Sequence, residues 1–251
     1  MRWLALDGAV NARDLGGLPL AGGGETRVGV LVRADNLQGL SARDVALLLD
    51  GVGVRLVVDL RTGVEVELEG PGPLAGRIEI RHRSLHPEEG ERTDVGVMPW
   101  RQGRFGDAEE SPAVRAYLGY LRDRPDSIVS ALRDVAESDG AAIVHCAAGK
   151  DRTGMVCALA LEAVGVEREA VVADYVATGE RIGPVLARLR SSPTYAHDLE
   201  GRPDEVHIPR AETMERVLEL VDERFGGAVA WLSEHGFADD DLAGLRERLR
   251  T

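Results

Sequence analysis

Ile143-Val144-His145-Cys146-Ala147-Ala148-Gly149-Lys150-Asp151-Arg152-Thr153-Gly154 is the stretch of this 251-residue chain that decides its fold. Its first residues are apolar and β-branched, as in a buried strand, and a helical pattern begins at Arg152. A tight loop from Cys146 to Arg152 joins the two. A buried strand that passes through such a loop into a helix is typical of a protein with alternating strands and helices.

The loop has the composition of an anion-binding site. Its small residues let the backbone curl so that successive N–H groups point inward, and the start of the following helix adds partial positive charge. Arg152 supplies a planar guanidinium that matches two phosphate oxygens. We therefore predict that phosphate is bound by Ala147, Ala148, Gly149, Lys150, Asp151 and Arg152.

Cys146 is the predicted nucleophile of this site. Positive surroundings lower the pKa of a thiol from about 8.5 into the range of roughly 3.5–7.5. Here the helix start, Arg152 and Lys150 supply this positive charge, and His145 adds to it when it is protonated. The hydroxyl of Thr153 is expected to donate to the sulfur. Such a thiolate attacks phosphorus to give a thiophosphoryl intermediate, which is then hydrolysed.

The second cysteine has a different setting. Cys157 lies inside the predicted helix among apolar residues, so we expect it to pack in the core. A His-Cys-x5-Arg pattern is expected by chance only roughly 0.005 times in a chain of this composition, which makes the loop around Cys146 a specific signal. Two cysteines form no disulfide framework and fit a reducing compartment.

Composition and charge exclude several classes of protein. The net charge of −13 argues against binding to nucleic acid. No apolar run is long enough to cross a membrane, and no signal-like stretch stands at the N-terminus. We expect a cytoplasmic location, although a secretion route that needs no signal is compatible with the sequence. No metal or organic cofactor is implied, because no Cys/His set has zinc-site spacing and the loop itself supplies nucleophile and electrophilic stabilisation.

The rest of the chain predicts an α/β fold. Buried strands are expected at residues 28–33, 54–60, 78–83 and 141–146, with helices between them at 42–50, 112–122 and 126–138. Strands that alternate with helices favour a mainly parallel sheet. After Cys146 the pattern is helical, at residues 152–164, 168–178, 185–190, 212–225, 228–234 and 240–250. Residues 191–210 are polar with three prolines and form either a connector or a lid. We expect one domain over residues 1–251.

The sequence also resembles a known protein family. Residues 145–154 are similar to the signature of the bacterial atypical tyrosine/lipid phosphatases, a group that includes a secreted mycobacterial tyrosine phosphatase. The likeness covers nearly the whole chain. It extends to residues 11–17 (Asn-Ala-Arg-Asp-Leu-Gly-Gly), 31–33, 58–61 with Glu65, 172–175 and 225–227.

The resemblance implies a three-layer protein-tyrosine-phosphatase-like fold and a lid within residues 181–210. It also implies that Cys146 is the nucleophile and Arg152 the phosphate clamp. Lys150 resembles the lysine of inositol-lipid phosphatases, and Asp151 resembles the aspartate of myotubularins. Activity on phosphoinositides beside phosphotyrosine is therefore expected.

The general acid stays open between several carboxylic acids. A proton donor to the leaving oxygen is worth typically about 10²–10⁴-fold in rate. Asp151 lies within the loop, and its alternative role is to accept loop hydrogen bonds or to steer the substrate. Glu88, Glu89 and Asp94 follow the third predicted strand and are the other candidates.

Charged residues at the ends of other predicted strands have a supporting role in this interpretation. Asp59 and Arg61 are expected to take part in a salt bridge near the site, with Arg13 or Asp14 as candidate partners. Arg33 and Asp35 are interpreted in the same way. Tyr175 is expected in the core.

The function predicted from these observations is hydrolysis of phosphomonoesters, by a protein-tyrosine phosphatase of single, dual or phosphoinositide specificity. A phosphoinositide-selective lipid phosphatase is an alternative. A rhodanese-like sulfurtransferase is another, disfavoured because its loop does not need the closing Arg152. A non-catalytic phosphate-binding module is disfavoured because Cys146 and Arg152 are both intact. The sequence does not define the oligomeric state.

Overall fold

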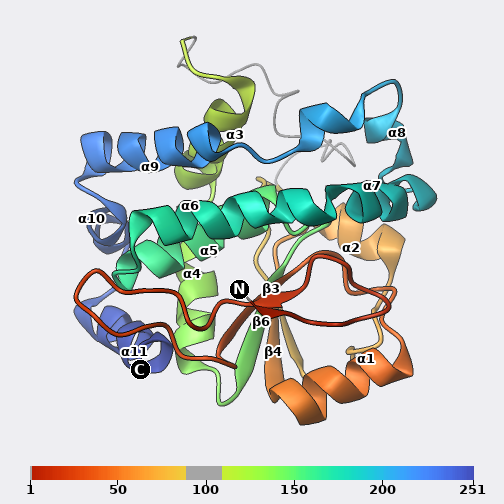
Figure 1. The fold of residues 1–251 in the computed structure, drawn as a ribbon, viewed down its shortest axis with the longest axis horizontal. Helices are drawn as coiled ribbons and strands as arrows, with labels where there is room; N and C mark the ends of the chain where they lie inside the picture. The colour runs from red at the N-terminus through yellow and green to blue at the C-terminus, as the bar shows by residue number, and fades with distance from the viewer. Residues whose placement is uncertain (1, 89–108) are drawn as a thin grey trace.

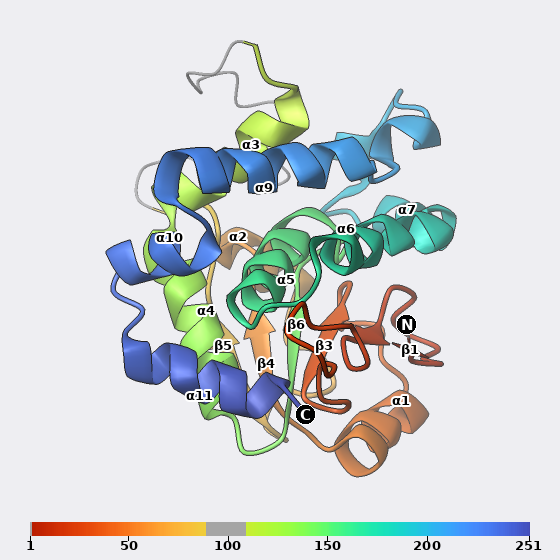
Figure 2. The same cartoon turned by 60° about the vertical axis from the view of Figure 1, so that its left-hand side comes forward.

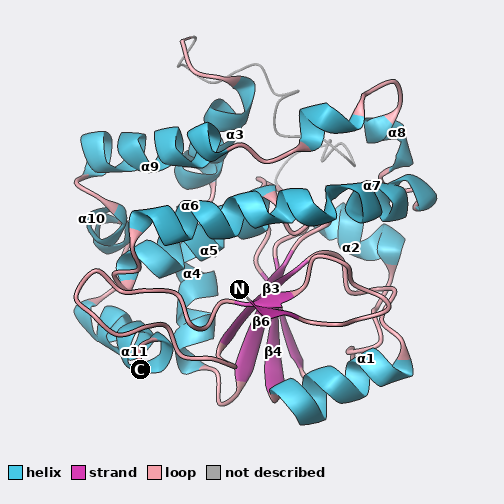
Figure 3. Cartoon of the chain, in the orientation of Figure 1, coloured by secondary structure: helices cyan, strands magenta, loops and turns pink. Residues whose placement is uncertain are grey.

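The computed structural model describes residues 2–88 and 109–251, and a sheet lies at its centre with helices around it (Figures 1 and 3). The six strands follow the order β1-β2-β3-β6-β4-β5 across the sheet. Their bounds are β1 Arg2–Trp3, β2 Arg13–Asp14, β3 Leu31–Ala34, β4 Val54–Asp59, β5 Glu79–His82 and β6 Ala141–His145.

The sheet is mainly parallel, as the alternation of strands and helices predicted. β3, β6, β4 and β5 run parallel to one another, while β1 and β2 add an antiparallel edge. β6 lies between β3 and β4, so the segment that leaves β6 emerges at the middle of the sheet. In such sheets ligands bind outside the carboxyl ends of the parallel strands.

Helices account for most of the remaining chain. Their bounds are α1 Ala42–Ala46, α2 Gly63–Glu69, α3 Pro112–Asp123, α4 Pro125–Glu137, α5 Asp151–Ala163, α6 Arg168–Ala177, α7 Ile182–Ser191, α8 Ala196–Leu199, α9 Ala211–Phe225, α10 Ala228–Glu234 and α11 Asp239–Leu249. A π-helical turn at Leu47–Val52 continues α1, and 3₁₀ turns occupy Thr178–Arg181 and Asp204–His207.

Two apolar clusters cover the two faces of the sheet and give the expected three layers. Leu56, Val58 and Val144 face a large cluster formed with α3, α4, α5, α6, α9, α10 and α11. Val57 and Ile143 face a smaller cluster formed with α1 and the N-terminal segment. Figure 2 shows α1 on one side of the sheet and α4, α5 and α6 on the other.

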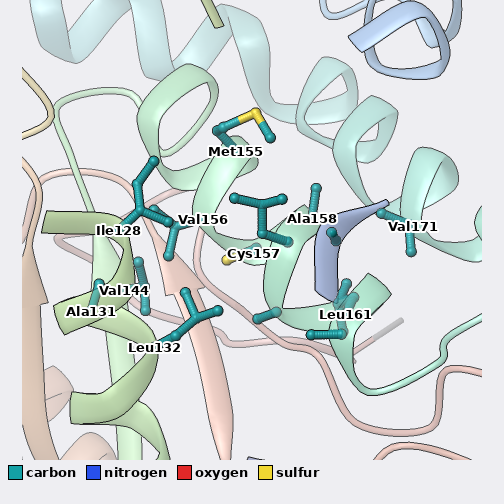
Figure 4. Close-up of a cluster of buried hydrophobic side chains, with 14 of the residues drawn as sticks. Ile128, Ala131, Leu132, Val144, Met155, Val156, Cys157, Ala158, Leu161 and Val171 are labelled. Atoms are coloured by element: carbon teal, nitrogen blue, oxygen red, sulfur yellow. The ribbon is translucent and has the colours of Figure 1, made fainter. Parts of the chain in front are cut away.

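The close-up in Figure 4 shows α5 packed between α4 and α6. Met155, Val156 and Ala158 of α5 meet Ile128 of α4 and Val171 of α6 there. Cys157 is 1% exposed in the same cluster, which confirms its predicted place in the core. α5 is buried along most of its length, and its first residues carry the predicted site. Deleting one large side chain from such a core typically costs about 2–5 kcal/mol.

Several elements differ from the sequence-based expectation, and the two short strands β1 and β2 were not predicted at all. Residues 28–30 do not belong to β3, because Gly29 has a φ of +74° and the chain turns there. α2 was not predicted, since its seven residues begin with glycine and carry no long apolar stripe. Residues 191–210 contain α8 and a 3₁₀ turn rather than irregular chain alone.

Candidate active site

The loop of residues 146–152, called the phosphate loop below, joins β6 to α5 at the carboxyl end of the sheet. Groups outside the loop hold three consecutive carbonyls of the loop. Ala147 O accepts from Asn36 N at 3.0 Å, Ala148 O from Asn11 Nδ2 at 2.9 Å and Gly149 O from Arg33 Nη2 at 2.6 Å. Because the peptide bonds are trans, the N–H that follows each of these carbonyls points the opposite way. The loop therefore turns successive N–H groups away from these donors, as an anion-binding concavity requires.

Gly149 is required by this geometry. Its φ is +65°, and a Cβ atom at this position would lie 2.5 Å from the carbonyl oxygen of Ala34. Only glycine adopts this conformation without strain and leaves room for the end of β3.

Glu65 of α2 holds the guanidinium of Arg152 by two hydrogen bonds. Arg152 Nη1 donates to Glu65 Oε2 at 2.6 Å and Nη2 to Oε1 at 2.9 Å. Glu65 Oε2 also accepts the Thr62 N–H, so the start of α2 fixes the carboxylate. Burial disfavours the charge, yet Arg152 lowers the pKa of Glu65 to about 2. The pair is therefore ionised, and Arg152 is fixed beside the loop.

Cys146 and His145 lie at the end of β6, and both are 2% exposed. His145 Nδ1 is 3.2 Å from the carbonyl oxygen of Cys146, and Nε2 is 3.5 Å from Asp59 Oδ2. Burial opposes the charge of Asp59, but His145 and Arg61 hold the pKa of that carboxyl well below its ordinary value. A negative charge therefore faces Nε2 of the His145 ring.

The expected salt bridge at Asp59 and Arg61 exists, but with different partners. The two residues pair with each other, with Arg61 Nη2 at 2.5 Å from Asp59 Oδ2. Neither Arg13 nor Asp14 takes part. Arg13 pairs with Asp174 at 2.7 Å, and Asp14 accepts the N–H groups of Gly16 and Gly29.

Asp151 is the first residue of α5 and meets a chain of two hydroxyls. Tyr117 OH donates to Asp151 Oδ1 at 2.6 Å, and Tyr175 OH lies 2.8 Å from Tyr117 OH. Each hydroxyl has one proton. Because Tyr117 gives its proton to Asp151, Tyr175 must be the donor in the bond between the two tyrosines. Tyr175 is 3% exposed and belongs to the core, as predicted.

The side chains of Lys150 and Thr153 are both buried next to the loop. Lys150 is 6% exposed, and its Nζ donates to the carbonyl oxygen of His207 at 2.9 Å and lies 3.6 Å from Asp151 Oδ1. Thr153 is fully buried, and its Oγ1 has no hydrogen-bond partner within the described part of the chain. The expected bond from Thr153 to the sulfur of Cys146 is therefore not formed in this structure.

Residues 182–199, called the cover below, comprise α7 and α8 and pack on the phosphate loop. Val185, Leu186, Leu189, Tyr195 and Leu199 form an apolar cluster with Ala147 of the loop. One ion pair also holds the cover, since Arg188 Nη1 lies 2.5 Å from Asp35 Oδ2. Asp35 and Arg33 thus have supporting contacts near the site, as expected.

The other candidates for the general acid, Glu88, Glu89 and Asp94, do not belong to the phosphate loop. Glu88 accepts the Gly63 N–H at 2.7 Å at the start of α2, and its side chain is 38% exposed. Glu89 and Asp94 lie outside the described residues.

Within residues 2–88 and 109–251, no group of three or more His, Cys, Asp or Glu side chains is arranged to hold a metal ion. No helix there is long and apolar enough to span a membrane.

Several residues around the loop were missed by sequence reasoning. Glu65 was noted only as part of a family pattern, although the Thr-x-x-Glu spacing of residues 62–65 is a signal for a helix start. Asn11 was part of another such pattern, and nothing local shows that it contacts the loop. Tyr117 lies within α3, and nothing in the sequence of that helix indicates that its hydroxyl reaches Asp151.

Comparison with known proteins gives concordant matches. The model of a family described as the tyrosine phosphatase family matches residues 4–251. The chain is 29% identical over 272 residues to the triple specificity protein phosphatase PtpB of Mycobacterium tuberculosis, a match that covers 96% of each chain. It is 31% identical over 178 residues to a putative tyrosine-protein phosphatase of Cupriavidus necator, with 71% of this chain and 63% of the relative covered. A tyrosine-protein phosphatase of Nostoc commune is 27% identical over 209 residues, with 80% and 68% covered.

Proposed function

This chain belongs to the tyrosine phosphatase family, and we propose that it is a cysteine-dependent phosphatase with Cys146 as the nucleophile. Its reaction is the hydrolysis of phosphomonoesters. One observation supports this most directly. Three carbonyls of the phosphate loop are held by groups outside it, which leaves the following N–H groups directed the opposite way, as binding of an anion by the loop requires. Cys146 begins that loop, and Arg152 ends it with its guanidinium fixed by Glu65.

In the proposed mechanism the loop binds the phosphoryl oxygens before any bond is made. The N–H groups of residues 147–152 and the guanidinium of Arg152 donate to the oxygens. Donors fixed in advance stabilise the charge of the transition state more than mobile ones, because they need no reorganisation. Glu65 occupies one edge of the guanidinium, so the remaining N–H groups are those that meet the substrate.

The chemistry has two steps. The thiolate of Cys146 attacks phosphorus, the bond from phosphorus to the ester oxygen breaks, and that oxygen takes a proton as it leaves. Water then attacks the cysteinyl phosphate and loses a proton, the sulfur–phosphorus bond breaks, inorganic phosphate is released and the thiolate is regenerated. No electrons are exchanged with a cofactor in either step.

Asp151 is the proposed proton carrier between these steps. It gives a proton to the leaving oxygen and takes one from the attacking water, which is the usual exchange of acid and base roles. The position of Asp151 in the loop supports this role, and Tyr117 orients its Oδ1. Glu88 is less suited because it is engaged at the start of α2.

Three further loop residues have proposed supporting roles. His145 would act through its contact with the Cys146 carbonyl. Thr153 would stabilise the sulfur with its buried hydroxyl, which has no other hydrogen-bond partner among the described residues. Lys150 would bind additional phosphate groups once its amino group leaves the His207 carbonyl.

Phosphotyrosine is the proposed substrate class, with phosphoserine, phosphothreonine and phosphoinositides as further substrates. The relative whose name states triple specificity matches along 96% of both chains, and the cationic Lys150 next to the site suits a substrate with several phosphates. A phosphoinositide-selective enzyme remains the second candidate on the strength of Lys150.

We propose that the cover acts as a lid on a single domain. Cys146 is 2% exposed while the cover packs on Ala147, so a bulky phosphorylated side chain reaches the sulfur only after the cover moves. A cytoplasmic location also remains a proposal, and cell fractionation tests it.

The function is tested by turnover of a phosphotyrosine peptide and of soluble phosphoinositides without added metal. Activity on at least one of these sets is expected, lost in Cys146→Ser and retained in Cys157→Ala, which alters the other thiol. The substrate ratio assigns the specificity, and Lys150→Ala is expected to lower activity on phosphoinositides more than on phosphotyrosine. Thiosulfate turnover with no phosphatase activity, or full activity of Cys146→Ser, would contradict the proposal.

A further inference from the structure

Four polar side chains lie buried against the phosphate loop without belonging to it. Asn11 and Arg13 are fully buried, and Arg33 and Asp174 are 1% and 2% exposed. They come from the N-terminal segment, β2, β3 and α6, and they are called the loop support below. The mechanism described above assigns no step to them, although burying charged side chains is costly unless each is paired.

Asn11 contacts the loop with its amide nitrogen, and Arg13 defines which way that amide points. Asn11 Nδ2 donates to Ala148 O at 2.9 Å and to Gly149 O at 3.2 Å. Arg13 Nη1 donates to Asn11 Oδ1 at 2.6 Å. A guanidinium has only donors, so the oxygen of Asn11 must face Arg13 and the nitrogen must face the loop.

Asp174 holds two arginines at once. Arg13 Nε lies 2.7 Å from Asp174 Oδ1, and Arg33 Nη1 lies 2.5 Å from Asp174 Oδ2. Burial disfavours the charge of Asp174, yet the two guanidiniums lower the pKa of that carboxyl, so it stays ionised. The other edge of Arg33 is turned to the loop, with Nη2 at 2.6 Å from Gly149 O and 3.4 Å from Lys150 O.

These contacts fall on the carbonyls of Ala148, Gly149 and Lys150, the middle of the phosphate loop. In a planar trans peptide the C=O of one residue and the N–H of the next point in opposite directions. Holding these carbonyls therefore determines the direction of the N–H groups of Gly149, Lys150 and Asp151. A carbonyl that rotated inward would turn its partial negative charge toward the phosphate.

We propose that Asn11 and Arg33 are positioning residues that orient the phosphate-binding N–H groups of the loop, and that Asp174 with Arg13 fixes them in place. The inference rests on the proposed function, because it concerns the same loop. The loop support adds no atom to the substrate contacts. Its effect is to keep the loop in the anion-binding conformation when no anion is present, so that binding requires no ordering of the backbone.

The test measures anion binding apart from catalysis. In a Cys146→Ser background, calorimetry gives the Kd of the full-length protein for inorganic phosphate. Adding Asn11→Ala or Asp174→Asn is expected to raise that Kd by roughly 10–100-fold, the range for losing one hydrogen bond from a loop N–H to the charged phosphate. Arg33→Lys keeps the positive charge but cannot reach both Asp174 and Gly149, and it is expected to weaken binding similarly.

Asp134→Asn is the matched control. Asp134 is also a buried acid that holds two arginines, Arg81 at 2.6 Å and Arg83 at 2.8 Å, but it does so between α4 and the end of β5. It is expected to lower the melting temperature and leave the Kd for phosphate unchanged. If Asp174→Asn does not fold, Asn11→Ala still decides, because its removal leaves both ion pairs of Asp174 intact.

The outcomes separate this inference from the proposed function. Variants of the loop support that bind phosphate as tightly as the Asp134→Asn control would overturn the inference, even if the protein with Cys146 turns over its substrates. An Arg33→Lys variant with unchanged binding would show that charge alone matters and would also contradict it. Failure of the proposed function appears instead as absent turnover by the unsubstituted protein.

Discussion

The phosphate loop meets the loop support through directed hydrogen bonds, whereas it meets the cover mainly through apolar contacts. Asn11 and Arg33 each bind particular carbonyl oxygens, and such bonds weaken steeply when their angles change. The contacts of Leu186 and Leu189 with Ala147 have no preferred direction. The difference supports the proposal that the loop keeps its shape while the cover moves aside for a substrate. A site of this design separates the geometry of catalysis from access to it.

The largest effect is expected from Glu65→Gln, which extends the comparison to Arg152. A neutral amide would hold the guanidinium less firmly, and a small misplacement of a catalytic group costs roughly 10²-fold in rate. We expect kcat/KM for a phosphotyrosine peptide to fall by about that factor. Glu162→Gln is the control, because it removes a similar pair of contacts to Arg168, at 2.9 and 2.7 Å, away from the loop. Equal losses in the two variants would contradict a special role for Glu65.

The same substitution has a pH signature. The pKa of Glu65 is lowered from 4.5 to about 2 in the folded chain, so its ionised form stabilises the fold fully above about pH 4.5. This contribution is lost as the pH falls toward 2. Unfolding curves between those pH values should therefore show a smaller acid-induced loss of stability in Glu65→Gln than in the unsubstituted protein.

A smaller effect is expected at Asp151 from Tyr117→Phe, which removes a directed contact but leaves the loop intact. We expect kcat to fall about tenfold, as for the loss of one hydrogen bond to a charged group, with a changed pH profile. Tyr120→Phe is the matched control from the same helix, since Tyr120 OH is buried without a hydrogen-bond partner in the described residues. Activity lost equally in both variants would show that Tyr120 acts at the site as well.

The smallest effect on kcat is expected from Leu186→Ala in the cover, which tests the apolar half of the comparison. Leu186 is 2% exposed, and its truncation should loosen the cover and let iodoacetamide alkylate Cys146 about tenfold faster. Leu220→Ala in α9, 3% exposed in the large cluster, should lower the melting temperature similarly without faster alkylation. Unchanged alkylation in Leu186→Ala would mean that the cover does not limit access to the sulfur.

The parts of the structure that could be predicted from sequence are those with local signals. β4 and β6 are buried apolar runs, and the loop after β6 combines small residues with a cysteine and an arginine at a specific spacing. α5 begins within one residue of its expected start. Asp59 and Arg61 pair across a single intervening residue, so a salt bridge was predictable although its partners were misjudged.

The parts that could not be predicted depend on distant contacts. Asp174 lies 161 residues from Arg13, and no pattern in either segment indicates which acid pairs with which arginine. α2 places Glu65 beside Arg152, but its short apolar content hides it among turns. The contact of Lys150 with the His207 carbonyl requires the path of the chain after α7, which its prolines and polar residues leave undefined.

The distance between Arg13 and Asp174 along the chain also has a consequence for synthesis. Ribosomes add roughly 5–20 residues per second, so Arg13 waits on the order of 10–30 seconds before Asp174 has been made. Asn11 likewise waits for Ala148, 137 residues later. Until then Arg13 and Arg33 have no ion-pair partner at Asp174, and burying their guanidiniums without it is costly. The proposed phosphate-binding loop is therefore completed late, after all six strands of the described sheet have been translated.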